Sequence, residues 1–273
     1  MNDTIRKSLA QRHGTTDRIC VSAYKAGNPK PYLIERFVDG IDAAAQLIEK
    51  YIDKPNILAM WSNLHKLPAG ATERKKEQIE AYTNLVVDID RRVKMDNGSK
   101  VNATEAERAV LLEKGKDILA FLKPHFGSAV VADSGNGYHL AWRIQALTPR
   151  EGQQLYSEVL SILRAKFESP DVNMEIDTSL ADETQLVTVW GTWNRKYTHS
   201  EERPQRQRRI LSIPGNQPPV LRSAIELFCA EHGSEIVQQP PATRSGYEHR
   251  KANSFWLENH GPSHYFEWAH PYL

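Results

Sequence analysis

The stretch TNLVVDIDRR, residues 83–92, is an apolar strand that ends in two aspartates. Side chains alternate between the two faces of a strand, so Leu85 and Ile89 lie on one face and Asp88 and Asp90 lie together on the other. Two carboxylates this close repel each other unless a positive charge lies between them. Because Mg²⁺ and Mn²⁺ prefer carboxylate oxygen, the stretch predicts a divalent metal site at the end of the strand. The alternative is a strand that runs into an acidic, solvated turn.

The composition is that of an ordinary globular protein. The chain has 273 residues, of which 40% are hydrophobic and 25% are charged, enough for one large domain or two small ones. The chain has 35 Lys and Arg residues and 34 Asp and Glu residues, so its net charge is close to zero. A polyanion such as a nucleic acid would therefore have to bind a local stripe of basic residues. Cys20 and Cys229 have no metal-type spacing, which fits a reducing cytosol. Without a long apolar stretch or an apolar signal core, we expect a soluble, cytoplasmic protein with no membrane contact.

Strand and helix patterns are interleaved along the chain, which favours an α+β sheet covered by helices on one face. Thr104 with Glu107 forms a capping box, and Thr148, Pro149 and Glu151 start a further helix. The tail from Gln238 has the composition of a linker followed by an aromatic segment. Helices are expected at 39–53, 102–123, 148–167 and 220–231, and strands at 56–64, 83–90, 128–144 (a hairpin), 173–179, 185–192 and 208–213.

A second candidate site is DSGNGYHLAW, residues 133–142, where Gly135 and Gly137 permit a tight hairpin turn. Ser134 and His139 flank this turn and are expected to face each other across its mouth. A serine hydroxyl, exposed backbone N–H groups and an imidazole at one mouth can hold a phosphate. The alternative is a purely structural hairpin, since Asn-Gly is itself a strong hairpin turn.

A third candidate site begins with the predicted strand 173–179, where Glu175 and Asp177 share one face. Further on, GTWNRK (191–196) places a glycine before an amide and two cations, which suits an anionic ligand that approaches the backbone. The alternative is a hairpin loop with solvated charges. The run ERPQRQRR (202–209) adds four arginines, although a basic run is usually a solvated edge.

Together these motifs resemble the archaeo-eukaryotic primase superfamily, in its primase-polymerase branch. That family has a D-x-D that ends an apolar strand, a serine-to-histidine hairpin, a further Asp, then G-T-x-N-x-K and R-P-x-R. The matching residues, which lie within roughly 65–215, are in family order Asp88-Ile89-Asp90, Ser134-Gly135-Asn136-Gly137-Tyr138-His139, Asp177, Gly191-Thr192-Trp193-Asn194-Arg195-Lys196 and Arg203-Pro204-Gln205-Arg206.

The resemblance implies a fold and a division of the chain. The fold would be α+β, with a catalytic core sheet and helices that resemble the RNA-recognition motif, packed against an N-terminal αβ unit. The N-terminal αβ subdomain would span 1–82, and the catalytic subdomain with the metal and nucleotide site would span 83–235. A linker and C-terminal tail would occupy 236–273.

The resemblance also implies template-directed nucleotidyl transfer on single-stranded DNA, with nucleoside triphosphates (NTP or dNTP) as substrates. Two divalent ions, Mg²⁺ or Mn²⁺, would clamp the attacking and leaving oxygens. Asp177 is preferred to Glu175 as the third ligand because it lies nearer the strand end and holds the family position. The catalytic and metal-binding residues would be Asp88, Asp90 and Asp177, and the nucleotide-binding residues would be Ser134, Asn136, His139, Asn194 and Lys196.

One departure from the family pattern precedes the G-T-x-N-x-K motif. Members of this branch often have R-x-x-R-x-P there, whereas this chain has QLVTVW, residues 185–190. The missing arginines leave open which cations contact the nucleotide or the template. Candidates for the template groove are the basic loop 66–76 and the run 203–209. Candidates for base stacking are Trp142, Trp190 and Trp193, and at least one of these is expected to pack in the core instead.

Two other functions are open. A metal-dependent nuclease could use the same carboxylates and histidine with water as nucleophile, and it would need no triphosphate pocket. A non-catalytic replication-initiator or nucleotide-binding module would bind nucleic acid but incorporate nothing. Binding of a nucleoside triphosphate would distinguish a polymerase from a nuclease. Incorporation of nucleotides would distinguish a polymerase from a binding module.

Overall fold

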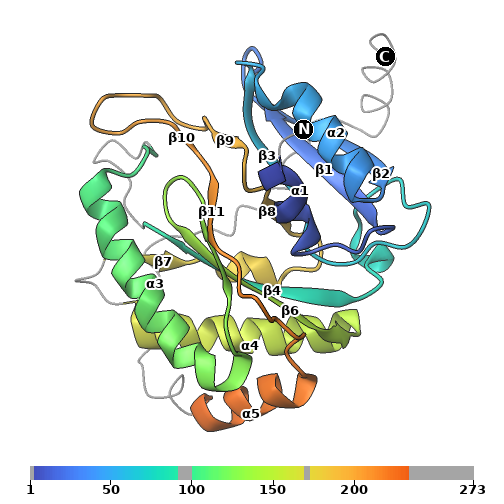
Figure 1. Cartoon of the computed structure of the whole chain (residues 1–273), viewed down its shortest axis with the longest axis vertical. Coiled ribbons are helices and arrows are strands. Elements are labelled where there is room, and N and C mark those ends of the chain that lie inside the picture. Colours follow the sequence, from blue (N-terminus) through green and yellow to red (C-terminus); the bar gives the residue numbers. More distant parts are fainter. Residues whose placement is uncertain (1–2, 92–99, 169–172, 234–273) are drawn as a thin grey trace. The chain divides into compact units, whose positions relative to one another are not determined.

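A five-stranded antiparallel sheet in the order β11-β5-β6-β4-β7 carries the predicted motifs (Figure 1). The computed structural model describes residues 3–91, 100–168 and 173–233, which belong to the first of two units, Met1–Val237 and Gln238–Leu273. The strands of this sheet are β4 (Tyr82–Asp90), β5 (Val130–Asp133), β6 (Tyr138–Leu147), β7 (Glu175–Ile176) and β11 (Arg209–Ser212).

Helices cover one face of this sheet. The chain runs β4, α3 (Glu105–Phe126), β5, β6, α4 (Pro149–Phe167) and β7, an order of elements like that of the RNA-recognition motif. Both long helices begin with the predicted capping boxes, at Thr104 and Thr148. Helix α5 (Arg222–His232) packs on α3 and α4 (Figure 1). The predicted α+β fold class is confirmed.

A second antiparallel sheet lies on the other side, in the order β2-β1-β3-β8 (Figure 1). Its first three strands come from the N-terminal segment, but its last strand comes from the middle of the third motif region. The division of the chain at residue 82 stays a prediction. The elements are α1 (Asp3–Ala10), β1 (Arg18–Lys25), β2 (Tyr32–Asp39), α2 (Ile41–Ile52), β3 (Ile57–Asn63) and β8 (Leu186–Thr188).

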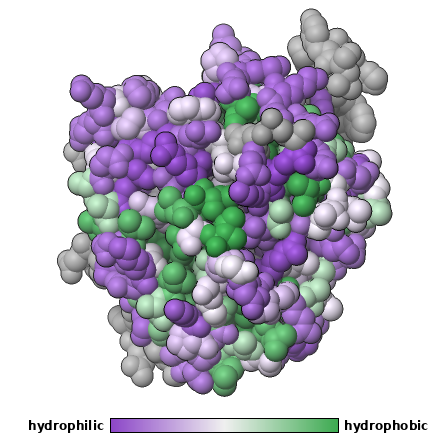
Figure 2. Space-filling model, viewed as in Figure 1, coloured by the Kyte–Doolittle hydropathy of each residue, from purple (hydrophilic) through white to green (hydrophobic). Residues whose placement is uncertain are grey.

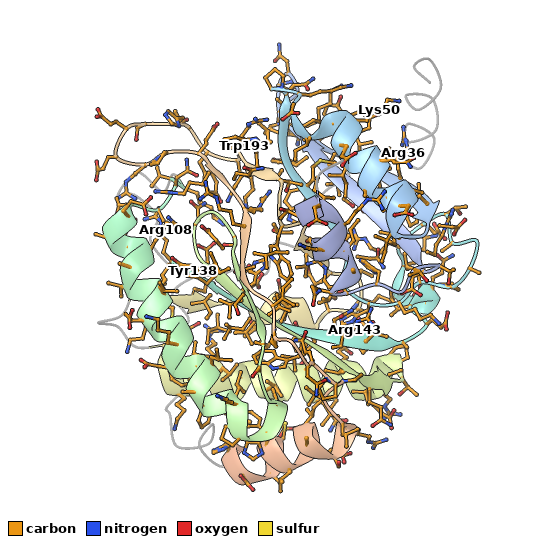
Figure 3. The ribbon with its side chains drawn as sticks, viewed as in Figure 1. Arg36, Lys50, Arg108, Tyr138, Arg143 and Trp193 are labelled. Atoms are coloured by element: carbon orange, nitrogen blue, oxygen red, sulfur yellow. The ribbon has the colours of Figure 1, made fainter. Side chains whose placement is uncertain are left out.

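Polar side chains of the five-stranded sheet bond to the backbone that follows α1 and β3. Asn84 of β4 donates from Nδ2 to the backbone carbonyls of Arg12 (3.1 Å) and Leu64 (2.7 Å). Arg143 of β6 donates to the carbonyls of Gln11 (3.3 Å) and His13 (2.8 Å), as its position below α1 allows (Figure 3). These bonds hold the end of α1 over the five-stranded sheet, on the face that also carries the aspartates.

The remaining elements form the outer part of the third motif region. Strands β9 (Trp193–Asn194) and β10 (Arg206–Gln207) make a short antiparallel ribbon, and β11 follows β10 at the edge of the large sheet. Figure 2 shows hydrophilic residues toward this ribbon and apolar residues near the middle of the same face. Leu211 of β11 is 50% exposed. None of the helices among the described residues is long and apolar enough to cross a membrane.

Candidate active site

Three of the predicted residues lie in one row across the five-stranded sheet. Asp88 of β4 is directly opposite His139 of β6 in the antiparallel register, so their side chains leave the same face. On the other side of Asp88, the backbone N–H of Asp177 donates to the Asp88 carbonyl (3.1 Å). Asp90 follows on the same face of β4. The fold therefore brings the three predicted carboxylates and the histidine together.

The two aspartates of β4 have pKa values that are shifted in opposite directions. Burial would raise the pKa of Asp88, but the neighbouring His139 and Lys196 lower it below its ordinary value. Burial, and then the charge of Asp88, raise the pKa of Asp90 to about 6. The pKa of Asp177 is also raised, by burial and then by Asp88. Such a set of mutually repelling carboxylates is a site that a cation would stabilise.

Asp88 has a buried carboxylate oxygen that fits a divalent ion. His139 Nε2 lies 3.3 Å from Asp88 Oδ1, but this contact lacks hydrogen-bond geometry. Among the described residues, Oδ1 therefore has no hydrogen-bond partner although it is shielded from solvent. Oxygen ligands from two or three carboxylates suit Mg²⁺ or Mn²⁺. The residues present fit the divalent ions that the motifs predict.

A second group of possible metal ligands lies elsewhere, in the last turns of α3 and α5. His125, Glu231 and His232 have ligand atoms within 4.8 Å of one another. His125 Nε2 is 3.3 Å from a carboxylate oxygen of Glu231, and its ring lies against Phe228. This group is a second place where an added divalent ion could bind.

The raised pKa of Asp90 leads to a pH-dependent prediction for the metal-free protein. A folded-state pKa of about 6 against an ordinary 3.8 contributes stability below pH 4, which is lost as the pH rises through 6. Asp90→Asn should therefore stabilise the metal-free protein at pH 8 by up to about 3 kcal/mol, and the gain should vanish near pH 4. The measurement is the difference in melting temperature between variant and wild type from pH 4 to 8.

Comparing the variant with the wild type cancels the effect of two buried histidines on the pH dependence of stability, because both proteins contain them. Burial lowers the pKa values of His13 and His65 to about 3, so both destabilise the fold as the pH falls below 6.5. At pH 8, Mn²⁺ should make the wild type more stable than Asp90→Asn, because it should stabilise the wild type and not the variant.

If the stabilisation by Mn²⁺ is lost on substitution of His125 instead, the ion binds at the second group of ligands. An Asp90→Asn variant that is no more stable than the wild type at pH 8 would contradict the repulsion.

The glycine hairpin is tied closely to its neighbours. The Ser134 hydroxyl accepts a bond from the Gly137 N–H (3.0 Å), and the Asp133 carboxylate accepts one from the Gly135 N–H (2.7 Å). Asn136 accepts a bond from the Ala103 N–H (3.0 Å) through Oδ1, which links the turn to the start of α3. In the register, His139 lies opposite Ala132, so it does not face Ser134 as the sequence suggested. The hydroxyl proton of Ser134 has no acceptor within the described residues.

Gly137 lies against the end of the strand that carries the aspartates. A Cβ atom at this position would be 2.0 Å from the carbonyl oxygen of Ile89 and 3.0 Å from Asp90 Cα. Gly137→Ala should therefore cost about 2–3 kcal/mol and lower the melting temperature by roughly 5–10 °C. Gly215→Ala is the control, since its Cβ would meet nothing within 4 Å. Equal melting temperatures for the two variants would show that Gly137 is not packed tightly against the backbone of β4.

Positive side chains from the third motif lie beside the carboxylates. Burial, and then the charge of Arg208, lower the pKa of Lys196. The carboxylates of Asp90 and Asp88 act in the opposite direction, so the ammonium group lies within their field. Arg208 is 1% exposed and donates to the carbonyls of Ser134 and Trp193. The sequence suggested Arg208 as part of a basic edge, whereas the structure makes it a buried support for the hairpin.

Asn194 also supports the hairpin from the third motif. Its Nδ2 donates to the Ser134 carbonyl (3.3 Å), while its buried Oδ1 has no hydrogen-bond partner among the described residues. The predicted nucleotide-binding residues Ser134, Asn136, His139 and Asn194 are therefore all buried around one turn. Their contact with a nucleotide stays a prediction.

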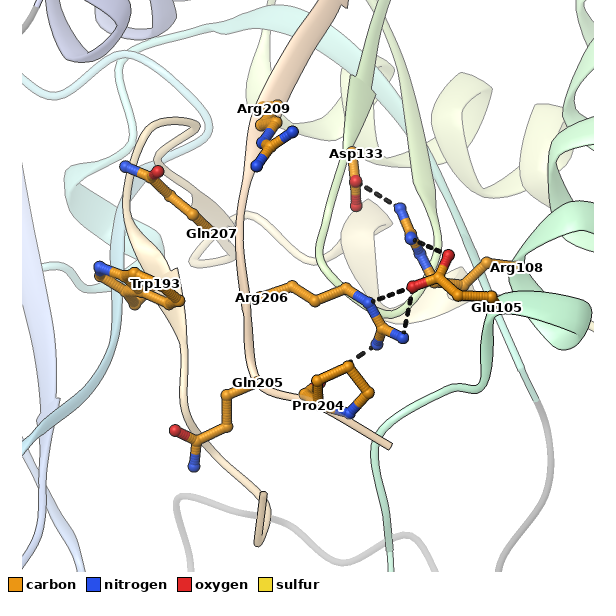
Figure 4. A pocket seen from close by; sticks show the side chains of 9 residues that line it. All are labelled: Glu105, Arg108, Asp133, Trp193, Pro204, Gln205, Arg206, Gln207 and Arg209. Carbon is orange, nitrogen blue, oxygen red and sulfur yellow. Dashed lines mark hydrogen bonds and ion pairs between the residues drawn. The ribbon is translucent and has the colours of Figure 1, made fainter. Parts of the chain in front are cut away.

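A pocket of about 400 Å³ lies beyond the hairpin, between α3 and the β9–β10 ribbon (Figure 4). Glu105 accepts bonds from Arg206 (2.8 Å) and Arg108 (2.7 Å) in this pocket. Arg209 is exposed and has no ion pair within the described part of the chain. Trp193 also lines the pocket, with the Arg195 guanidinium 4.8 Å from its ring centroid. The pocket is distinct from the carboxylate row, because Asp133 lines it from the opposite face of the hairpin to His139.

Two predictions about nucleic-acid contacts change in the structure. Trp142 and Trp190 are 2% and 0% exposed, so neither can stack on a base in this conformation, and Trp193 remains the candidate. The cations of the basic loop 66–76 are largely neutralised by ion pairs. The pairs are Lys66–Glu80, Arg74–Glu35, Lys75–Glu73 and Lys76–Asp182.

Comparisons with known proteins bear on the fold of the chain. No protein-family model and no curated protein sequence matches the chain. The crystal structure of primase RepB′ is similar, with a TM-score of 0.50 and 15% identity over 86% of this chain and 62% of that chain. The chain has the fold of a primase. A fold like that of primase RepB′ is what the resemblance in the motifs led us to expect.

Two other solved structures have lower TM-scores. The catalytic domain of primase RepB′ in complex with initiator DNA has a TM-score of 0.45 and 14% identity, over 87% of this chain and 100% of that one. The polymerase domain of Mycobacterium tuberculosis Ligase D in complex with DNA has a TM-score of 0.43 and 14% identity, over 86% and 91%. This chain spans 62% of the first RepB′ structure, and its likeness to that structure concerns the fold alone.

Proposed function

We propose that this chain is a primase-polymerase that adds nucleotides to a 3′-hydroxyl on a single-stranded DNA template. The observation that carries the proposal is the row of His139, Asp88 and Asp177 across the sheet, with the unpartnered oxygen of Asp88 at its centre. The primase fold and the order of the five motifs support it.

In this proposal, Asp88, Asp90 and Asp177 hold two divalent ions, Mg²⁺ or Mn²⁺. Bound there, the ions would neutralise charge on the attacking and leaving oxygens of the displacement. The carboxylates would position the ions because Asp88 and Asp90 lie on β4 and Asp177 directly follows the neighbouring strand β7. The pKa of Asp90 near 6 also means that its ligand oxygen is largely ionised at neutral pH.

The triphosphate tail would lie beside the hairpin. His139 would donate from Nε2, Ser134 from its hydroxyl proton, and Lys196 would add a point charge. Asn136 and Asn194 would act by holding the turn, and the free Oδ1 of Asn194 is an acceptor for a donor on the nucleotide. All these groups are preorganised, which lowers the free-energy cost of orienting the triphosphate.

Nucleic acid would contact the outer part of the third motif region. Trp193 offers a partly exposed ring for stacking, and Arg209 offers an exposed cation. Base stacking on an aromatic ring contributes about 1–3 kcal/mol per base, and cations along the groove bind phosphates. Trp193 and Arg209 both line the pocket described above, so one strand could contact both.

The test is a primer-extension assay on a single-stranded DNA template. A labelled primer, or no primer, is incubated with NTPs or dNTPs and with Mn²⁺ or Mg²⁺, and the products are sized on a gel. The proposal expects products that lengthen by template-directed additions. Asp88→Asn with Asp90→Asn is the matched inactive control, because it keeps the side-chain shape and removes the charges.

Two outcomes would overturn the proposal in different directions. Shortened template or primer strands that disappear in the double variant would assign the carboxylates to a nuclease. Binding of nucleotide and DNA with no change in product length under any metal would assign the chain to the class of non-catalytic binding modules.

A further inference from the structure

His139 has a buried partner that neither the motifs nor the carboxylates predict. The indole Nε1 of Trp190 lies 3.1 Å from His139 Nδ1, and the two residues are 0% and 2% exposed. An indole N–H can only donate, so Nδ1 must accept this bond. In the neutral imidazole the proton is then on Nε2, which is the nitrogen that faces Asp88 Oδ1 at 3.3 Å.

Trp190 is itself held by the N-terminal helix. Its backbone N–H donates to the Ser8 hydroxyl (2.8 Å), and the guanidinium carbon of Arg12 lies 4.9 Å from its ring centroid. Next to it, Gly191 has a φ of 101°, and a Cβ there would be 3.1 Å from Ile5. The end of α1 thus determines where the indole lies, although α1 is far from His139 in the sequence.

The cation over the indole is an unusual one. Arg12 is 3% exposed, and its Nε and one terminal nitrogen have no hydrogen-bond partner among the described residues. Its other terminal nitrogen donates to Ser62 Oγ (3.3 Å). A buried cation with so few hydrogen bonds is costly, so the face of the Trp190 ring is a principal partner. A cation on that face also draws electron density from the indole, which strengthens its N–H as a donor to Nδ1.

We propose that Trp190 is a positioning residue that fixes the tautomer and orientation of His139, and that Arg12 holds Trp190 in place. The inference rests on the proposed function in one respect, the role of His139 toward the triphosphate. With the proton on Nε2, His139 presents a donor to a phosphate oxygen. With the proton on Nδ1, it would present a lone pair, which repels that oxygen. Trp190 thereby keeps the imidazole in the form that binds phosphate.

The first test is the tautomer of His139 in the metal-free protein at pH 8. ¹⁵N NMR of the imidazole nitrogens, assigned with His139→Gln, should show a proton on Nε2 in the wild type. A proton on Nδ1 in the wild type would overturn the proposal without any variant. This measurement needs no nucleotide, so it remains valid even if the protein proves not to bind triphosphates and the proposed function fails.

The second test is Trp190→Phe, which keeps an aromatic ring for Arg12 and removes the N–H donor. We expect mixed tautomers of His139 and a loss of triphosphate affinity of about 5- to 30-fold, equivalent to one hydrogen bond. Single-stranded DNA binding should stay unchanged. Arg12→Met should shift both readouts in the same direction by a smaller factor, because the donor remains and only its support is lost.

Trp142→Phe is the matched control. Trp142 is equally buried, and its Nε1 approaches the Gly127 carbonyl (3.4 Å) instead of a histidine. It should lower the melting temperature as Trp190→Phe does, and leave the His139 tautomer and the triphosphate affinity unchanged. If Trp190→Phe behaves like Trp142→Phe, with wild-type tautomer and affinity, Trp190 is a packing residue and the proposal is wrong.

Discussion

Asp88→Asn and Asp90→Asn are each expected to reduce nucleotide incorporation by about 10³-fold or more, while the protein stays folded. Each substitution removes a charged ligand from the proposed metal site. The ions held there would stabilise the charge of the transition state by several kcal/mol. Asp90→Asn also removes a charge whose raised pKa shows that it destabilises the metal-free protein, whereas the lowered pKa of Asp88 shows that its charge is stabilised there. The measurement is primer extension in Mn²⁺, together with a melting curve of each variant.

Glu175 provides a matched control for the third carboxylate. It lies opposite Asp90 in the β4–β7 register and is exposed, so it shares the face of the sheet with the aspartates. Asp177→Asn should abolish incorporation and Glu175→Gln should leave it nearly unchanged. The reverse result would show that the ladder pair Asp90–Glu175 holds the ion and that Asp177 only caps the turn to Ser179.

His139→Ala is expected to weaken the binding of nucleoside triphosphate about 10- to 150-fold, equivalent to about 1.5–3 kcal/mol for a charge-assisted hydrogen bond. Single-stranded DNA binding should hardly change, because in the proposed function it would depend on cations such as Arg209. The measurement is a titration of triphosphate into the variant, with DNA binding and melting temperature measured in parallel.

The same variant separates the polymerase from the nuclease. In a nuclease, His139 would act on water or a leaving group, so its loss would slow cleavage and leave triphosphate affinity unchanged. If affinity is unchanged and only the melting temperature falls, His139 is a structural residue that pairs with Trp190. Either result would remove His139 from the nucleotide site.

Local patterns predicted most of the elements that carry the candidate site. Alternation in β4 placed Asp88 and Asp90 on one face, and the capping boxes at Thr104 and Thr148 marked the starts of α3 and α4. The Asn-Gly turn predicted the β5–β6 hairpin. Each of these features depends on residues a few positions apart, whose steric and hydrogen-bonding preferences act in the same way in most folds.

The features that local patterns did not predict concern which groups meet across long sequence separations. Basic residues in the loop 66–76 looked available for a template, but partners such as Asp182 lie over a hundred residues away. Trp190 looked like a stacking residue, but it is buried against His139. Composition and periodicity identify the charged residues and the apolar faces of helices and strands. They do not identify which residues contact one another when the sheets pack together.

The strand that presents two carboxylates, the hairpin that follows it and the order of chemical groups along the chain can all be read from the residues alone. The packing of the sheets is needed to place β8, from the third motif region, in the N-terminal sheet, where Trp190 contacts His139 and Arg12 contacts Trp190. The physical reason is that strand pairing and buried contacts are set by the packing of whole layers. A group that is buried must find its partner among the residues which that packing brings to it.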